Sequence, residues 1–194
     1  PPRKVPVKLR GELKKHLREL VKLKVLERVD HYTPWVNSIV IARKKNKTIR
    51  LCLDPRNLNK ALKRPVHYMP DTDFIRSELR DAKYFTVLDI SCGFWNLKLS
   101  KESSDLCTFN TPYGRYKFLR LAFGLNPSSD IFQSTMVDKF RDIEGLLIYV
   151  DDFCIYSKTV DEHDRILRKV LERARELGIK FNLPKCNFFK TSLK

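Results

Sequence analysis

Several common functional signals are missing from this chain. Its six glycines form no Gly-rich phosphate-binding loop. Its five cysteines include no C-x-x-C pair and no matching histidine spacing, which counts against structural zinc and against a disulfide framework. No apolar run is long enough to span a membrane, and no secretory signal peptide is recognisable. Free thiols are typical of a reducing compartment, so we expect an intracellular protein that is not secreted.

Positive charge, by contrast, is in excess. The 39 lysine and arginine residues outnumber 23 acidic residues, which gives a formal net charge of +16 over 194 residues. This imbalance points to a polyanion partner, most often nucleic acid, although a merely basic protein would also show it. The length suits one domain or two small, closely packed ones. Because the chain starts at Pro1 without Met, we expect it to be a piece of something longer.

The most informative stretch is residues 146–157, where two apolar, β-prone runs flank Asp151 and Asp152. The pattern predicts a hairpin with both aspartates in its two-residue turn. Asp is an ordinary turn residue, so a purely structural interpretation is open. Two adjacent like charges repel, however, and a hard divalent cation such as Mg²⁺ would relieve that repulsion. A further carboxylate would be needed, and Asp89, in the similar apolar run of residues 84–90, is the candidate.

A second hairpin is predicted by apolar runs at residues 38–42 and 48–54, joined by a tip at residues 43–47 that carries four basic side chains. Cations crowded on one tip repel each other unless phosphate neutralises them, which favours a tip that faces phosphate. A solvated charged turn is the alternative.

Apolar periodicity and turn signals predict the other elements. We expect residues 55–70 to be irregular, and a hairpin to turn at residues 111–114. Helices are expected at residues 9–24, 71–79, 127–140 and 160–177. The order of these elements predicts an α+β domain in which helices cover one face of an antiparallel sheet.

Five short motifs then occur in a fixed order: Leu-Asp54-Pro-Arg-Asn-Leu-Asn59-Lys, Val-Leu-Asp89-Ile-Ser-Cys-Gly-Phe94-Trp, Phe123-Gly124-Leu with Phe132-Gln133, Tyr149-Val-Asp151-Asp152, and Leu183-Pro-Lys185-Cys186. In this order the chain resembles the reverse transcriptase domain of gypsy-type LTR retrotransposons and their retroviral relatives. The resemblance implies a right-hand polymerase fold with an antiparallel, ferredoxin-like palm. Fingers would cover approximately residues 1–82 and 111–125, and palm residues 83–110 and 126–194.

The resemblance also implies a function, that of an RNA-directed DNA polymerase, a nucleotidyltransferase that extends a primer. Asp89, Asp151 and Asp152 match the family's catalytic carboxylates, which would hold two Mg²⁺ ions, or Mn²⁺ in their place, ~4 Å apart. The implied partners are deoxynucleoside triphosphates and a primer–template, either an RNA/DNA hybrid or a DNA duplex. A parent Pol polyprotein would also serve DNA integration, in the cytoplasm or in a virus-like particle.

Further matches concern the incoming nucleotide. Lys44 and Arg50 match fingers residues that grip the triphosphate, and a bidentate Arg suits that task. Phe94 matches the bulky residue that excludes a ribose 2′-hydroxyl and so selects deoxynucleotides. The alternative is a structural role for both residues, with Arg50 as a charge on the strand surface and Phe94 in the core. An RNA-templated RNA polymerase would carry a small or polar residue at position 94.

The remaining matches lie further along the chain. Phe123 and Gly124 match the floor beneath the incoming nucleotide, although Phe123 could also be a core residue. Gln133 and Lys185 match positions near the template strand and the nucleotide pocket.

The chain also departs from the family pattern. The fingers tip lacks the usual glycine, Ala122 stands where Pro is usual, and residues 127–130 replace the common Ser-Ala-Pro pattern. The primer-grip strand, thumb, connection and RNase H are absent, so we expect this fragment to extend a primer poorly. The alternative hypothesis is an inactive relic that only binds nucleic acid.

Overall fold

The computed structural model describes residues 4–43, 48–65 and 70–192. The chain forms two compact units, each assembled from two separate segments. Unit 1 comprises Pro1–Arg64 and Phe94–Ser128, and unit 2 comprises Pro65–Gly93 and Ser129–Lys194. The expected fingers and palm alternate along the chain in the same way with different bounds, and that division by function stays a prediction.

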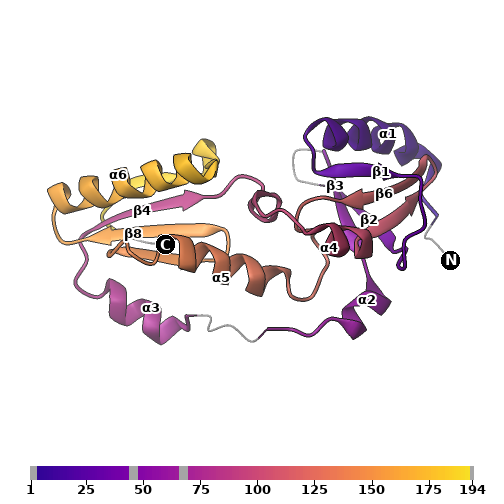
Figure 1. Ribbon diagram of the computed structural model, residues 1–194. Helices are drawn as coiled ribbons and strands as arrows, with labels where there is room; N and C mark the ends of the chain where they lie inside the picture. The colour runs from indigo at the N-terminus through magenta and orange to yellow at the C-terminus, as the bar shows by residue number, and fades with distance from the viewer. Residues whose placement is uncertain (1–3, 44–47, 66–69, 193–194) are drawn as a thin grey trace. The chain divides into compact units, whose positions relative to one another are not determined.

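The described residues of unit 1 form two antiparallel sheets and the helices α1, α2 and α4. Its elements, shown in Figure 1, are α1 (Val7–Lys22), β1 (Leu26–Val29), β2 (Ser38–Arg43), β3 (Ile49–Asp54), α2 (Arg56–Ala61), α4 (Lys101–Leu106), β5 (Thr108–Thr111) and β6 (Gly114–Phe118). One sheet has the order β1-β6-β5, and the other is the β2-β3 hairpin. The buried stripe of α1, Leu13, Leu17 and Leu20, packs into the same apolar core as Phe109 and Phe118.

The predicted helix at residues 9–24 and the predicted hairpins at residues 38–54 and around 111–114 are confirmed. Three elements of unit 1 were not predicted, namely β1, α2 and α4. The prediction of an irregular stretch at residues 55–70 was wrong where α2 lies. These elements have four to six residues each, too few to show a helical or alternating period.

Unit 2 is built on one four-stranded antiparallel sheet in the order β7-β8-β4-β9. Its elements are α3 (Thr72–Leu79), β4 (Tyr84–Asp89), α5 (Ser128–Phe140), β7 (Leu146–Tyr149), β8 (Asp152–Ser157), α6 (Val160–Leu177) and β9 (Asn187–Lys190). A 3₁₀ turn, η2 (Leu183–Lys185), precedes β9, and another, η1 (Gly93–Asn96), follows β4. Each expected helix of this unit is present, and α5 begins at Ser128, one residue later than expected.

Helices α5 and α6 contact the same face of this sheet. The rings of Phe140 on α5 and Phe153 on β8 meet edge-on, with centroids 4.9 Å apart. His163 on α6 hydrogen-bonds the hydroxyl of Ser157, four residues after Phe153 and therefore on the same face of β8. Figure 1 shows α6 running along β4 and β8. The predicted sheet with helices on one face is thus confirmed for these two helices.

Helix α3 reaches the sheet differently. The hydroxyl of Tyr156 on β8, whose side chain is on the opposite face from Phe153, donates to Glu78 Oε2 at 2.6 Å. No residue of α3 is buried. Among the helices that the structure describes, none is long and apolar enough to cross a membrane.

The central hairpin turns one residue earlier than predicted. Tyr149 pairs with Asp152, so the two turn residues are Val150 and Asp151, and Asp152 already belongs to β8. The prediction that Asp151 and Asp152 both form the turn was therefore wrong. Val150 adopts a left-handed backbone conformation with φ 50°, which is strained for a β-branched residue.

Candidate active site

Asp89 and Asp152 lie directly opposite each other in the sheet of unit 2. Asp89 is the last residue of β4, Asp152 is the first of β8, and the antiparallel register pairs them. Directly opposed residues in such a ladder have Cα atoms about 4.5–5.5 Å apart, with both side chains on one face. An aspartate from upstream therefore meets the central hairpin, as the sequence predicts.

The electrostatics of this pair are unfavourable. The pKa of Asp152 is raised above its ordinary value, first by burial and then by the negative charge of Asp89, while Lys185 partly offsets both effects. Like charges placed opposite each other destabilise a sheet. The pair therefore has a physical need for a nearby positive charge.

Lys185 at the end of η2 supplies one such charge. Its Nζ donates to both carboxylate oxygens of Asp89, at 3.3 and 3.0 Å. The Asp89 side chain is 20% exposed and that of Lys185 is 64% exposed, so solvent screens much of this ion pair. The hydrogen bond to Asp89 raises the pKa of Lys185. The N–H of Asn182 donates to the Asp89 carbonyl at 2.8 Å and fixes η2 beside β4.

Both the backbone and the side chain of Asp151 contact residues just after the end of β4. Its carbonyl accepts the N–H of Ile90 at 2.9 Å, so the hairpin turn is bonded to the residue after Asp89. A Cβ added at Gly93 would overlap Asp151 Oδ1 and lie 3.3 Å from the ring of Phe132. All three predicted carboxylates thus lie around the carboxyl end of β4.

The donor chemistry of these residues fits a hard divalent cation. All three offer oxygen only, and two of them repel each other in the register described above. In the ranges that the structure describes, no group of three or more His, Cys, Asp or Glu side chains forms a ready-made metal site. Mg²⁺ is commonly bound by one or two carboxylates together with substrate phosphates. The arrangement therefore suits an ion that arrives with a phosphate-bearing substrate.

Three predicted nucleotide-binding residues lie together in unit 1. The rings of Phe94 and Phe123 are 4.8 Å apart at their centroids. The guanidinium of Arg50, on the exposed side of β3, lies over the ring of Phe123 at 5.0 Å. Cation–π contact of this kind orients the guanidinium while its N–H groups can still donate. Only 8% of Phe94 is exposed.

Gly124 is the fourth predicted residue of this group, and its backbone conformation requires glycine at this position. Its φ is 106°, and a Cβ there would overlap the carbonyl oxygen of Leu53. The loop is tied to its surroundings by Asn59, whose side chain donates to the Gly124 carbonyl at 2.9 Å and accepts from the N–H of Asn126 at 3.0 Å. Asn59 belongs to the first sequence motif, but that motif did not indicate this role.

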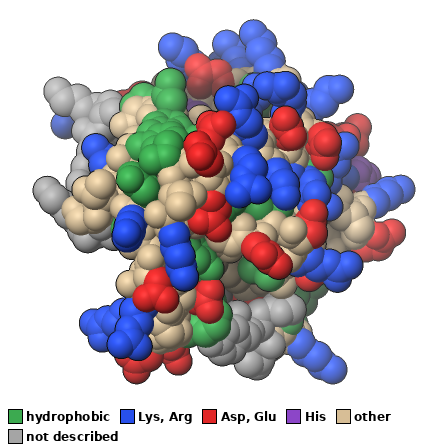
Figure 2. Space-filling model, turned by 90° about the vertical axis from the view of Figure 1, so that its left-hand side faces the viewer, with side chains coloured by type: hydrophobic (Ala, Val, Ile, Leu, Met, Phe, Trp, Pro, Cys, Tyr) green, Lys and Arg blue, Asp and Glu red, His purple; other side chains and the backbone are tan. Residues whose placement is uncertain are grey.

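Of the predicted fingers tip at residues 43–47, Arg43 is among the described residues. Lys44 lies outside the described residues. Arg43, just before it, is exposed and pairs with Glu12 at 3.0 Å. Figure 2 shows lysine and arginine side chains distributed over the face that it displays, with acidic side chains between them. On that face the excess positive charge is spread and does not form a single patch.

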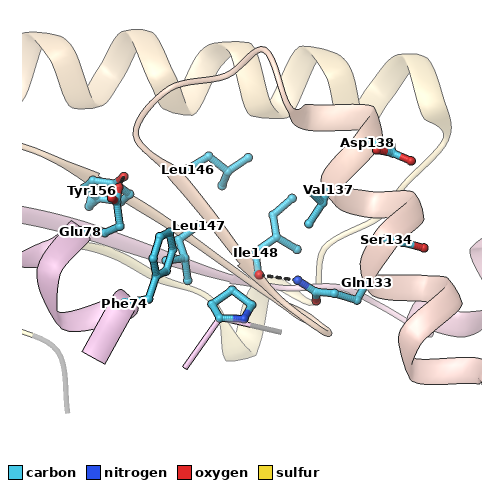
Figure 3. A pocket seen from close by; sticks show the side chains of 11 residues that line it. Phe74, Glu78, Gln133, Ser134, Val137, Asp138, Leu146, Leu147, Ile148 and Tyr156 are labelled. Atoms are coloured by element: carbon cyan, nitrogen blue, oxygen red, sulfur yellow. Dashed lines mark hydrogen bonds between the residues drawn. The ribbon is translucent and has the colours of Figure 1, made fainter. Parts of the chain in front are cut away.

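Gln133, which the resemblance matches to a position near the template strand and the nucleotide pocket, lies inside unit 2. It is 1% exposed, on α5, and its amide nitrogen donates to the carbonyl of Ile148 (Figure 3). It borders a pocket of about 420 Å³ whose walls come from α3, α5 and the β7–β8 hairpin. Phe74, Val137 and Leu146 contribute apolar surface to this pocket, and none of its described lining residues is one of the three aspartates.

Opposed aspartates at the joined ends of two antiparallel strands, covered on one face by two helices, are typical of the palm of a nucleic-acid polymerase. The chain belongs to the reverse transcriptase (RNA-dependent DNA polymerase) family, whose model matches residues 42–194. It is 31% identical over 196 aligned positions to the retrovirus-related Pol polyprotein from transposon opus of Drosophila melanogaster. That match covers 97% of this chain and 19% of the polyprotein.

Solved structures agree with this family. The chain is similar to foamy viral protease–reverse transcriptase in complex with double-stranded DNA, with a TM-score of 0.89 and 26% identity, over 100% of this chain and 34% of that one. It is also similar to that enzyme in complex with an RNA/DNA hybrid, with a TM-score of 0.84 and 27% identity, over 96% and 25%. The fold is therefore the fingers–palm fold of these enzymes, and the chain spans only a part of the proteins that it matches.

Proposed function

We propose that this chain is the fingers and palm of an RNA-directed DNA polymerase that acts within a longer Pol polyprotein. The observation that carries the proposal is the register of β4 and β8, which sets Asp89 opposite Asp152 beside the Asp151 turn. The reaction is attack of a primer 3′-hydroxyl on the α-phosphorus of a deoxynucleoside triphosphate. A P–O bond to the primer forms, and pyrophosphate leaves.

Asp89, Asp151 and Asp152 are the residues that would hold two divalent ions, Mg²⁺ or Mn²⁺. When bound, such ions make the hydroxyl a better nucleophile and neutralise charge on the phosphates. The protein itself contributes position and charge and no covalent intermediate. The Lys185 ammonium, held at Asp89, adds a positive charge on the same side of the site.

We assign selection of the nucleotide to residues of unit 1. Arg50 binds the triphosphate, while Phe94 excludes a ribose 2′-hydroxyl and so favours deoxynucleotides. The contacts of Arg50 and Phe94 with Phe123 support this role, because they bring a cation and a bulky ring to one place. Lys44 is assigned to the triphosphate by family resemblance, and Phe123 with Gly124 to the floor beneath the base.

The proposed partner is a primer–template, as DNA duplex or RNA/DNA hybrid, both of which were solved with the foamy viral enzyme. Thumb, connection and RNase H would come from the rest of the polyprotein. The proposed location is the cytoplasm or a virus-like particle.

The test replaces Asp151 by Asn in the full-length protein and measures Mg²⁺-dependent incorporation on a primed RNA template. Loss of one such group from the reacting centre should lower incorporation by at least about 10²-fold. Asp73→Asn makes the same charge change at a side chain that is 93% exposed on α3, and should have no effect. Incorporation that survives Asp151→Asn contradicts the proposal.

A relic that only binds nucleic acid is the second candidate, and the net charge of +16 favours it. It is distinguished by the absence of incorporation in the unmodified protein, which nevertheless binds nucleic acid in a salt-sensitive way.

A further inference from the structure

Gln133 connects helix α5 to the hairpin that carries two of the three aspartates. Its Nε2 donates to the Ile148 carbonyl at 2.8 Å, and its Oε1 accepts the Val150 N–H at 2.6 Å. Figure 3 shows the first of these bonds running from the helix to strand β7. Both polar ends of a buried amide are thus bonded to backbone on either side of Tyr149.

The backbone that Gln133 binds is strained. Val150 has φ 50°, a region that glycine or asparagine enters readily and a β-branched residue rarely does. Such a conformation persists only where the surrounding structure fixes it. The bond from the Val150 N–H to Gln133 fixes the peptide before Val150, and the bond from the Ile90 N–H to the Asp151 carbonyl fixes the peptide between Asp151 and Asp152.

The direction of the Asp151 side chain depends on this turn. Asp151 follows Val150 directly, and Asp152 enters β8 from the same turn to face Asp89. Relaxation of Val150 to a negative φ would rotate the peptide that joins it to Asp151. The carboxylate would then leave its place against Gly93, where no space for a Cβ exists.

We propose that Gln133 is a positioning residue, whose amide holds the Val150–Asp151 turn in its left-handed conformation and so keeps the Asp151 carboxylate against Gly93 and Asp152 opposite Asp89. The importance of Gln133 for catalysis rests on the proposed function. Its stabilisation of the turn conformation does not. Gln133 could reach a nucleotide only by breaking the two bonds that it makes to the hairpin.

The first experiment measures amide hydrogen exchange in the full-length protein by mass spectrometry with residue-level fragmentation. Gln133→Met keeps the length of the side chain and removes both bonds, so the Val150 amide should exchange about tenfold faster or more. Thr135→Val is the matched control, since it removes a hydrogen bond to Ile131 on the same helix without touching the hairpin. Unchanged exchange at Val150 in Gln133→Met overturns the proposal.

The second experiment uses steady-state incorporation and a rescue. Gln133→Met should lower kcat by about 10²-fold with the KM for the deoxynucleotide nearly unchanged, because misplaced carboxylates slow the reaction without weakening substrate binding. Adding Val150→Gly to this variant should raise kcat again by at least about tenfold, since glycine adopts a positive φ without hydrogen bonds that hold it there. A raised KM without rescue would mean that Gln133 contacts the nucleotide, and would overturn the proposal.

The two experiments also separate this inference from the proposed function. If the unmodified full-length protein incorporates no nucleotide, the proposed function fails while the exchange measurement still decides the role of Gln133. If Gln133→Met does not fold, Gln133→Met/Val150→Gly is expected to fold because the strain is gone. Failure of both variants to fold would show a core role only and overturn the inference.

Discussion

At the scale of single residues, Gly93 leaves no room for a side chain beside Asp151. Gly93→Ala would place a Cβ onto Asp151 Oδ1 and close to the Phe132 ring. Relief of this overlap would displace the Asp151 carboxylate, so incorporation by the full-length protein should fall by about 10²-fold.

Gly11 offers the matched control for this substitution. It is exposed on α1, and an added Cβ there meets nothing within 4 Å. Gly11→Ala should leave incorporation unchanged and raise the free energy of unfolding by about 0.5–1 kcal/mol, measured by urea titration. Equal activity of the Gly93→Ala and Gly11→Ala variants would contradict the packing argument.

The sequence predicted some residues of the site better than others. Asp89, Asp151 and Asp152 could be found because carboxylates at the ends of apolar runs are visible in a single chain. The position of Gln133 could not, because its partners are backbone atoms 15 and 17 positions away, and no sequence pattern reports such a bond. Gly93 appeared only within the Asp89 motif, and its contact with Asp151 was not predicted because it depends on the register of β8.

At the scale of elements, a buried histidine joins three strands and a helix of unit 2. His163 on α6 is 0% exposed and bonds Thr86 on β4 through Nε2 at 2.7 Å and Ser157 on β8 through Nδ1 at 3.0 Å. Ser157 donates its proton to the Thr159 carbonyl, so it must accept from His163. The N–H of Phe189 on β9 donates to Thr86, whose own proton then goes to Nε2. This network assigns the neutral Nδ1–H tautomer.

The free energy of unfolding should therefore depend on pH through His163. Burial lowers its pKa below the ordinary 6.5, while Asp164 and Glu162 oppose that shift. With a lowered pKa in the folded state, the unfolded state binds more protons, and stability is lost as the pH falls below about 6.5. The loss should approach about 1.4 kcal/mol per pH unit until the folded pKa is reached.

Urea unfolding between pH 7.5 and 5 checks this expectation. His163→Gln keeps one donor and one acceptor but does not titrate, so it should be less stable at pH 7.5 and show a smaller change with pH. Parallel pH profiles for the two proteins would contradict the assignment.

Elements with a clear period or a turn signal were predicted, and several short elements with neither were not. The helix α6 has a long buried stripe, a Thr159 side chain that accepts the Glu162 N–H, and a Gly178 with φ 70°. By contrast, β9 is exposed at all four positions and shows no alternation. The turn of the central hairpin was misplaced by one residue because pairing of Tyr149 with Asp152 decides it, and turn preference alone would not choose Val150.

At the scale of the whole molecule, each compact unit combines segments from two parts of the chain. Composition and periodicity predicted an α+β domain but not this division, because the contacts that define a unit join residues far apart in sequence. Asp89 and Lys185, for example, are 96 positions apart. The fingers–palm fold was instead implied by the order of five motifs along the chain. This inference used the motifs together and did not depend on the local structure of any one of them.

The last prediction concerns residues 1–194 expressed alone. The net charge of +16 should give binding to primer–template that weakens by at least about tenfold between 50 and 200 mM salt, because phosphate contacts release counterions. Extension should be poor beside that of the full-length protein, because the thumb that we propose for the rest of the polyprotein would be missing. Fluorescence anisotropy at the two salt concentrations and a gel extension assay measure both quantities. Asp151→Asn should leave binding unchanged and abolish the residual extension, so salt-insensitive binding or extension equal to the full-length protein would contradict this expectation.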